Sequence, residues 1–473
     1  MGLTSALSTS RSGLLAIEKW SETTASNIAN ASSEGYVRKS AELSTKVGPS
    51  GAQVMVTGIK REVDTALDRM HRTENSRVAK QQAIADGLEY YTGQLGQPGG
   101  AQSPSEQLNK FFGGLDLLVN NPANPALQRG FLDTAQGLAA SLNRAATSLG
   151  QTETDLVAGI TRNVETVNAT LHELADLNLQ LSRIEGQNMS RATLEDEIGR
   201  TIDKLSEVVD LRVTRIADGR VSVFSAGGTP LLEVNVVHDI SYDRGSGSLT
   251  AGGADVTPGV AGARGFENGS LAGQLTLQNE LLPRMRLQLD EFARVLVQGF
   301  QAADASLAPG QAGLFTDAGA AFDPAQLDGL AGRLSINDAV RPETGGSLWR
   351  LRDGIGAAAP GPASDGGQLT AFVAMLDGPQ SFSTGAGLGT NIDLTQYSAG
   401  MIADQQVVRT QALDRRDALS MSAESIGAMR RGVQGVNIDD ELQQLILIEQ
   451  SYAANSKVMS AVADMIDTLL ASL

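Results

Sequence analysis

Apolar residues recur every three or four positions near both ends of the chain, and this spacing constrains the fold more than any other feature. The stronger stripe occupies residues 445–473, where the only polar member is Asn455. Its members are Leu445, Ile448, Tyr452, Asn455, Met459, Val462, Ile466, Leu469 and Leu473. A helix with such a stripe has to bury it, so we expect a long helix packed on another helix or on another subunit.

A matching stripe lies near the N-terminus, with serine and threonine filling the gaps between its apolar members. Those members are Leu3, Leu7, Leu14, Ile17 and Ile28. Residues 1–47 carry five bases and four acids, whereas residues 437–473 carry one base and six acids. The opposite signs favour pairing of the two helices. Asn437 is expected to cap the C-terminal helix, with Asp439, Asp440 and Glu441 in its first turn.

The polar Asn455 within an apolar seam is typical of a helix pair that specifies its register at some cost in stability. Two interpretations stay open. The stripes could form an ordinary helical hairpin within one chain, or they could complete their burial only when several chains assemble.

Helical spacing also fills residues 63–95, 126–185 and 194–209, so the first 210 residues are predicted to be nearly all helix. The period then changes to two in residues 211–216 and 221–224, which flank Asp218-Gly219 and predict a β-hairpin with a tight turn. Further strands are expected in 231–240 and 248–250. Helices are expected in 282–296 and 401–429, and residues 306–390 read as a loop-rich insertion with a little β structure.

These patterns predict a mainly α protein with a β-rich middle, an α+β fold with a nested architecture. Residues 1–55 with 431–473 would form paired terminal coiled-coil helices, an axial core. Residues 56–205 with 271–305 and 391–430 would form a helical bundle domain. Residues 206–270 would form the β-hairpin region, and 306–390 a Gly/Ala-rich outer domain of β structure and loops.

Composition excludes several classes of function. The 473 residues include no cysteine, which excludes disulfides, thiolate metal sites and cysteine nucleophiles. With 37 Lys and Arg against 54 Asp and Glu, the net charge of −17 argues against binding to nucleic acid or to an anionic membrane surface. Met1 to Leu15 lack a basic stretch followed by an apolar run, and no window approaches 18 apolar residues. We therefore expect a soluble chain that uses no cleavable signal peptide.

Motifs that imitate catalytic sites are incomplete. His172-Glu173 begins like the helical zinc motif HExxH, but Asp176 stands where the second histidine is needed. The glycine-rich runs at 354–359 and 385–389 lack the strand, helix or Lys-Ser/Thr that a nucleotide loop requires. His71 and His238 have no evident carboxylate or serine pattern nearby. The sequence thus predicts no enzyme, no cofactor and no metal.

A resemblance to a known family rests on motifs at both ends and in the middle. The segment Ser26–Arg38, SNIANASSEGYVR, resembles the N-terminal motif of bacterial flagellar axial proteins, in which an Asn-rich helix end precedes Gly-Tyr. Residues 435–442 and 449–458 are similar to the end of the hook-associated FlgK family. Val167-Asn168, residues 174–178 and residues 205–209 resemble that family's helical domain. Ser33-Glu34 replaces the usual Thr-Pro, Glu195-Asp196-Glu197 stands for a degenerate Asp-x-Arg-Asp segment, and residues 306–390 align with nothing in the family.

The resemblance implies a structural adaptor at the junction of flagellar hook and filament. It would assemble as a ring of identical subunits, contact the hook protein and a second junction protein, and bind an export chaperone beforehand. It would leave the cell through the flagellar type III apparatus and reside in the extracellular flagellum. The implied assembly interface comprises the two stripes together with Asn27, Asn30, Gly35 and Tyr36. The alternatives are another axial protein, such as the second junction protein or the hook protein, or an acidic helical adhesin or scaffold.

Overall fold

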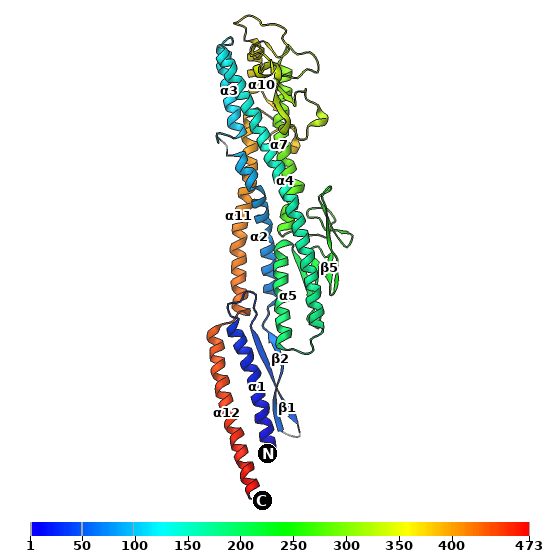
Figure 1. The fold of residues 1–473 in the computed structure, drawn as a ribbon, viewed down its shortest axis with the longest axis vertical. Helices are drawn as coiled ribbons and strands as arrows, with labels where there is room; N and C mark the ends of the chain where they lie inside the picture. Colours follow the sequence, from blue (N-terminus) through cyan, green and yellow to red (C-terminus); the bar gives the residue numbers. More distant parts are fainter. Residues whose placement is uncertain (1, 49–50, 98, 473) are drawn as a thin grey trace.

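The protein is a long, narrow molecule with both termini at one end (Figure 1). The computed structural model describes residues 2–48, 51–97 and 99–472; the stripe residue Leu473 lies outside them. Helix α3 (Pro104–Asn120) and helix α10 (Gly367–Asp377) lie at the end opposite the termini. The mainly helical fold with small sheets in its middle and with paired terminal helices is as the sequence predicts.

The end that carries the termini, which we call the terminal rod, consists of two helices and a hairpin. Helix α1 (Leu3–Ala29) and helix α12 (Ile438–Ala471) lie side by side and run in opposite directions (Figure 1). The Asn437 side chain accepts a 3.0 Å hydrogen bond from the Asp439 amide, as expected of a helix cap. Strands β1 (Lys39–Gly48) and β2 (Gly51–Arg61) form an antiparallel hairpin along the other side of α1.

This hairpin corrects two expectations, that the first 210 residues are nearly all helix and that residues 1–55 are helical up to the bundle. Thr45, Val47, Val54, Val56 and Thr57 are β-branched, which favours strands over helix. Helix α1 covers the outer edge of β2. Thr9 Oγ1 donates to the Ala52 carbonyl at 2.7 Å, and the Val54 amide donates to Ser12 Oγ at 3.2 Å. Small hydroxyl residues of α1 therefore satisfy strand groups that would otherwise be unpaired.

The middle of the molecule, the body, is a bundle of long helices. Helices α2 (Thr65–Leu95), α4 (Pro125–Ser182) and α5 (Met189–Val208) confirm the predicted helical stretches, and helix α11 (Leu394–Gln434) packs along α2. Asp64 and Asn124 cap α2 and α4 by accepting hydrogen bonds from amides of the first turn. Because α4 is 58 residues long, it extends from the body into the far end of the molecule.

A small β lobe lies against one side of the body. Its first sheet, in the order β3-β4-β5-β6, contains β3 (Leu211–Arg215), β4 (Val221–Ser225), β5 (Pro230–Glu233) and β6 (Val236–Val237). The second contains β7 (Ile240–Asp243), β8 (Ser248–Ala251) and β9 (Ala254–Asp255). The hairpin predicted around Asp218-Gly219 is the β3–β4 pair, with Gly219 at a φ of 86°.

The end remote from the termini, the head, combines α3, the start of α4 and residues 304–393, together with the end of the long helix that leads into them. Helix α6 (Ser270–Thr276) continues through a π-helical turn (Leu277–Leu281) into α7 (Leu282–Ala303). Short strands β10 (Phe315–Asp317) and β11 (Leu334–Ile336) pair with each other, as do β12 (Gln380–Ser381) and β13 (Asn391–Ile392). The remaining short helices are α8 (Leu330–Arg333) and α9 (Arg350–Asp353), with 3-10 turns at 324–326, 338–340, 342–344 and 384–386.

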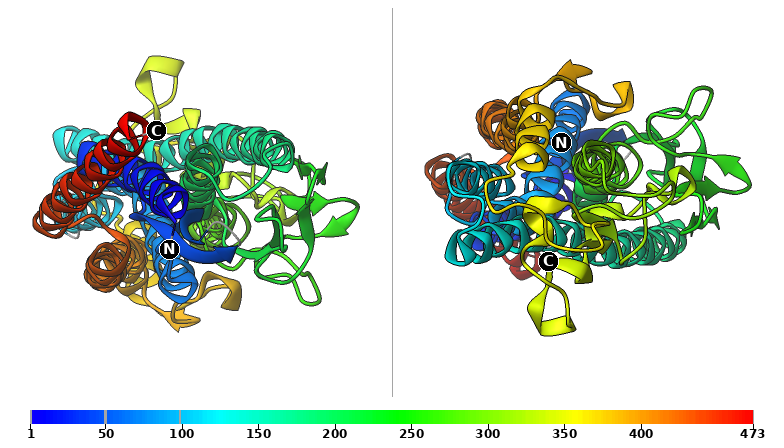
Figure 2. Two further views of the ribbon diagram at one scale, coloured as in Figure 1. Left: turned by 90° about the horizontal axis from the view of Figure 1, so that it is seen from below. Right: turned by 90° about the horizontal axis from the view of Figure 1, so that it is seen from above.

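Residues 306–390 are a packed part of the head, which differs from the expectation of an outer insertion. Phe315 and Phe372 are fully buried, and their rings lie 5.1 and 4.8 Å from the ring of Phe300 on α7. Phe315 also lies 5.5 Å from Phe111 on α3. The aromatic residues are far apart in the sequence, so local periodicity could not indicate that they share one core. Figure 2 shows these segments gathered around α3, α4 and α7.

Candidate assembly interface

The contact between α1 and α12 follows a heptad pattern. Four residues of α12 spaced seven apart, Glu441, Ile448, Asn455 and Val462, are buried or half-buried, and Ile448 and Val462 are only 4% and 3% exposed. On α1, Ala16 and Ile17 are buried. The other predicted stripe residues Leu3, Leu7, Leu14, Ile28, Met459 and Ile466 are half-buried. This spacing of seven is that of a coiled-coil seam.

Asn455 meets the one glycine of α1 in this seam. A side-chain carbon placed on Gly13 would lie 3.0 Å from Asn455 Oδ1, so the absence of a side chain there makes room for the amide. Asn455 Nδ2 donates back to the Ser451 carbonyl at 3.0 Å. The contact of Asn455 with Gly13 thus fixes the register of α12 relative to α1.

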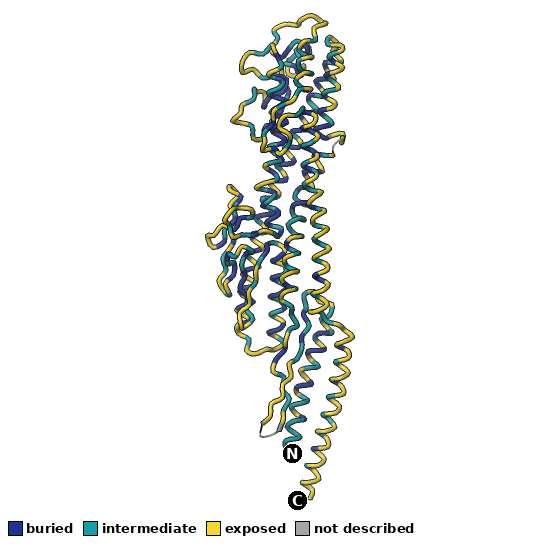
Figure 3. The backbone as a smooth tube through the Cα atoms, turned by 180° about the vertical axis from the view of Figure 1, so that it is seen from behind, coloured by how far each residue is buried: buried dark blue, intermediate teal, exposed yellow. Residues whose placement is uncertain are grey.

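A large apolar surface of α12 faces solvent in the single chain. Three predicted stripe residues, Leu445, Tyr452 and Leu469, belong to it and are 38%, 56% and 53% exposed. We call this surface the outer face of α12. Its large apolar members are Ile438, Leu442, Leu445, Ile446, Leu447, Tyr452, Val458, Met465, Leu469 and Leu470. Figure 3 shows α12 as the most exposed helix of the rod. A helix that is apolar nearly all round is typical of a buried environment.

The Asn-rich motif forms the turn that leads from α1 into β1. Asn27 is 1% exposed and bonds the Lys39 backbone twice, donating from Nδ2 to the carbonyl at 2.8 Å and accepting at Oδ1 from the amide at 3.0 Å. Tyr36 also donates to Asn27 Oδ1 at 3.0 Å, and Asn30 Nδ2 donates to the Ser26 carbonyl at 2.9 Å. Gly35 has a φ of 70°, which a residue with a side chain adopts only with strain. The motif therefore fixes the direction in which the chain leaves α1.

The terminal rod joins the body at an elbow, formed by residues 30–39, 61–72, 191–203 and 427–441. Lys39 Nζ lies 2.7 Å from Asp196 Oδ2, and both side chains are 2% exposed. Arg61 Nε lies 2.7 Å from the other oxygen of Asp196. Arg38 Nε lies 2.7 Å from Glu441 Oε1, and the Arg38 amide donates to the Gln434 carbonyl at 2.8 Å. Buried ion pairs therefore tie β1 and β2 to α5 of the body, while the Arg38 pair ties α12 to the segment that precedes β1.

A second cluster at the elbow centres on Arg430. Its guanidinium lies 2.8 Å from Asp68 and 2.8 Å from Asp203, which also pairs with Arg72 at 2.6 Å. Half-buried His71 lies beside it, with Nδ1 3.4 Å from Arg430 Nη1. Burial lowers the pKa of His71, and Arg430 lowers it further.

Sequence reasoning missed this network, because its partners lie far apart in the chain. Lys39 and Asp196 are separated by more than 150 positions, and no local pattern marks a lysine as buried. The departure Glu195-Asp196-Glu197 was the one available signal. One expectation for the histidines is also corrected, because His238 lies 3.0 Å from Glu233. His172 is exposed on its helix and lies 3.0 Å from Asp239.

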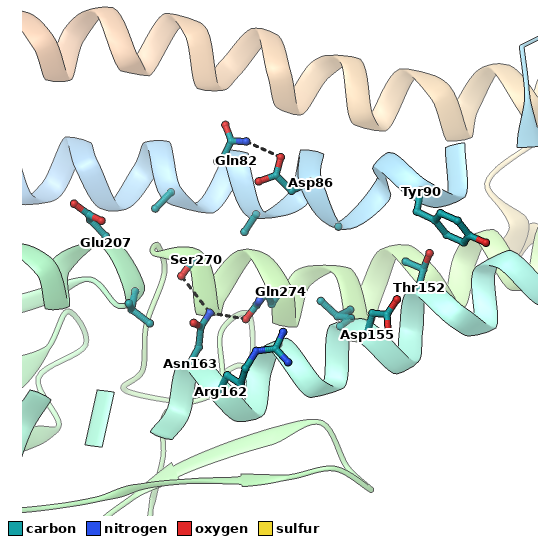
Figure 4. A pocket seen from close by; sticks show the side chains of 16 residues that line it. Gln82, Asp86, Tyr90, Thr152, Asp155, Arg162, Asn163, Glu207, Ser270 and Gln274 are labelled. Carbon is teal, nitrogen blue, oxygen red and sulfur yellow. Dashed lines mark hydrogen bonds between the residues drawn. The ribbon is translucent and has the colours of Figure 1, made fainter. Parts of the chain in front are cut away.

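A cleft of about 560 Å³ lies in the body between α2, α4 and α6 (Figure 4). Some of its polar side chains bond one another. Asn163 Nδ2 donates to Gln274 Oε1 at 2.9 Å and Gln82 Nε2 donates to Asp86 at 2.6 Å. Among the described residues, no three of His, Asp and Glu converge as metal ligands, and none of the described helices is long and apolar enough to cross a bilayer.

Two family models match the chain. The model described as the flagellar hook-associated protein FlgK helical domain matches residues 95–313, which include α3 to α7 and the β lobe. The model described as the flagellar basal body rod FlgEFG protein C-terminal matches residues 433–473, which correspond to α12.

Curated relatives agree with these models. Flagellar hook-associated protein 1 of Bacillus subtilis (strain 168) is 24% identical over 98% of this chain and 97% of its own length. Flagellar hook-associated protein 1 of Escherichia coli (strain K12) is 23% identical over 63% of this chain and 56% of its own length. Among solved structures, the flagellar hook junction protein FlgK from Burkholderia pseudomallei matches with a TM-score of 0.43 and 23% identity, over 52% of this chain and 46% of that one.

Proposed function

Because the chain belongs to the flagellar hook-associated protein FlgK family, we propose that it is a structural subunit of the bacterial flagellum that joins the hook to the filament. It assembles through the terminal rod, with α1 and α12 continuing the axial core that both polymers share. Its partners are further copies of itself, the hook protein and a second junction protein.

The exposed outer face of α12 is the observation that carries this proposal. The seam with α1 buries only one side of α12 and leaves large residues such as Ile446, Tyr452 and Leu470 more than half exposed. Burial of apolar surface stabilises association by about 25 cal/mol per Å². A helix of this composition gains that stabilisation only when neighbouring chains cover it, as in a polymer core.

The proposal includes the route by which the chain reaches the flagellum. It is exported through the flagellar type III apparatus, and an export chaperone holds it beforehand. The narrow shape supports a role along a filament axis (Figure 1). In this proposal the protein is a structural subunit rather than an enzyme, since the carboxylates and cations of the elbow pair mainly with one another.

Cells that produce the chain without residues 438–473 test the proposal. We expect bare hooks and filament subunits released unpolymerised into the medium, measured by electron microscopy and by blotting of the culture supernatant. The double variant Leu445→Asp/Tyr452→Asp should give the same result with the purified monomer still folded, because both side chains are exposed before assembly.

Val407→Asp on α11 is the matched control, since Val407 is 46% exposed but lies on the body. This variant should leave filaments attached. Firmly attached filaments on cells that lack the whole protein would contradict the junction role and would favour another axial role.

A further inference from the structure

The β1–β2 hairpin presents a second apolar surface on the terminal rod. Val47 and Leu43, on one face of the hairpin, are 80% and 48% exposed, whereas Met55 lies on the opposite face and is 46% exposed. Helix α1 covers the outer edge of β2, whereas within the described residues β1 pairs with β2 alone. An exposed apolar strand at an open sheet edge is a ready surface for another chain.

The hairpin and α12 lie on opposite sides of α1 (Figures 1 and 2). Each terminal rod therefore has two different exposed apolar surfaces that point in different directions. A contact between unlike surfaces of identical subunits is heterologous, and such contacts generate rings or helical arrays.

The charges of the two surfaces are complementary. Helix α12 exposes five acids, Asp439, Asp440, Glu449, Asp464 and Asp467, against Lys457 alone. On the hairpin, Lys46 and Lys60 are exposed against Glu42. Contact between two α12 helices would bring like charges together, which disfavours a symmetric arrangement. Contact between α12 and the hairpin brings opposite charges together.

The two surfaces also lie at the same position along the axis of the rod. Gly13 of α1 lies beside Asn455, and Thr9, one turn closer to the N-terminus, bonds Ala52 near the hairpin tip. Because α12 runs opposite to α1, the tip lies level with the turn of α12 that follows Asn455. Tyr452, Val458 and Met465 are exposed around this height.

We propose that the β1–β2 hairpin of one copy docks on the outer face of α12 of the next copy. This inference rests on the proposed function and names the surface that meets α12 between adjacent subunits. It accounts for the exposed apolar residues of the hairpin, which the packing of α1 on α12 leaves unexplained.

Photo-crosslinking in assembled flagella tests the contact. The full chain with p-benzoylphenylalanine at Val47 is produced in the bacterium that encodes it, flagella are isolated and irradiated, and crosslinked peptides are mapped by mass spectrometry. We expect a dimer of this chain on a denaturing gel, with the crosslink in residues 438–471 and centred between Tyr452 and Met465. The same probe at Val407 on α11 should give no crosslink to α12.

Crosslinks from Val47 to a different flagellar protein, or to any other part of a second copy, would overturn the inference. The proposed function would still stand in that case, provided that filaments remain attached to the hooks. Absence of the chain from isolated flagella would instead overturn the proposed function.

The charges give a second readout. Lys46→Glu/Lys60→Glu should reduce the yield of the dimer, and Glu449→Lys/Asp467→Lys in the same chain should restore it. An unchanged dimer yield in the first of these variants would also overturn the charge-matched contact.

Discussion

Asp196 holds two cations at the elbow, and its removal tests how strongly the rod is tied to the body. Asp196→Ala leaves Lys39, which is 2% exposed at its side chain, and Arg61 without their shared carboxylate. Removing one partner of a buried ion pair costs about 3–5 kcal/mol, because an uncompensated charge stays buried. We expect a loss of that size in the free energy of unfolding, measured by urea titration.

Glu22→Ala is the matched control for this prediction. Glu22 pairs with Lys19 at 2.7 Å, but both side chains are more than half exposed. Solvent screens such a pair, so its removal should leave the urea midpoint unchanged. Equal effects of the two substitutions would show that burial of the elbow pair adds nothing to stability.

His71 makes the elbow sensitive to acid. Burial lowers its pKa, as do Arg430 and Arg72, while Asp203 and Asp68 oppose the shift. Since the folded pKa is below the unfolded value of about 6.5, protons bind more tightly to the unfolded chain. Stability from His71 is therefore present above pH 6.5 and is lost as the pH falls through the lowered folded value.

The measurement is the thermal midpoint of wild type and His71→Gln as the pH is lowered from about 7.5 to 5. The difference between the two proteins should change across this range, with the wild type losing more. A constant difference would show that His71 does not contribute to acid sensitivity.

Helix α12 has two faces with separate roles, and one substitution on each tells them apart. Val462 is 3% exposed in the seam with α1, whereas Met465, three residues later, is 48% exposed. Val462→Asp places a charge in the seam and should release α12, which hydrogen exchange of the monomer will show as lost protection throughout 438–471. Met465→Asp should leave that protection intact and block assembly instead. Loss of protection in both variants would contradict the assignment of two faces.

At the level of elements, the long helices and the β3–β4 hairpin could be predicted because their periods persist over many residues. The β1–β2 hairpin could not, since the stripes on either side of it suggested continuous helix and the sequence between its strands contains neither Asn-Gly nor Asp-Gly. The β-branched residues Val54, Val56 and Thr57 were the available sign.

The interface residues were predicted as one stripe, but the structure divides them. Ile448, Val462 and Ile466 belong to the seam, while Tyr452 lies on the outer face. A 3,4 spacing identifies an apolar helix but does not say how many sides of it are covered within one chain. The ion pairs of the elbow depend on residues brought together by the tertiary fold, so no local pattern reveals them.

At the scale of the whole molecule, the rod and the rest have separate cores. One continuous core runs from Ile84 on α2 to Ala412 on α11 and extends from the body into the head. None of its buried residues comes from the described parts of α1, the hairpin or α12. Polar contacts at the elbow join the two cores, and these transmit less cooperativity than shared apolar packing.

The two tryptophans lie in these separate parts and make the last prediction measurable. Trp20 on α1 donates to Gln444 on α12, and Trp349 lies in the head just before α9. We expect Trp349→Phe, which retains only Trp20, to report unfolding of the rod at a lower urea concentration than Trp20→Phe, which retains only Trp349. Phe372→Ala removes a fully buried ring next to Phe300 and should cost about 3–5 kcal/mol. Because that ring belongs to the continuous core, Phe372→Ala should lower the urea midpoint reported by Trp349 and leave the midpoint reported by Trp20 unchanged. A common shift of both midpoints would mean that rod, body and head unfold as one unit.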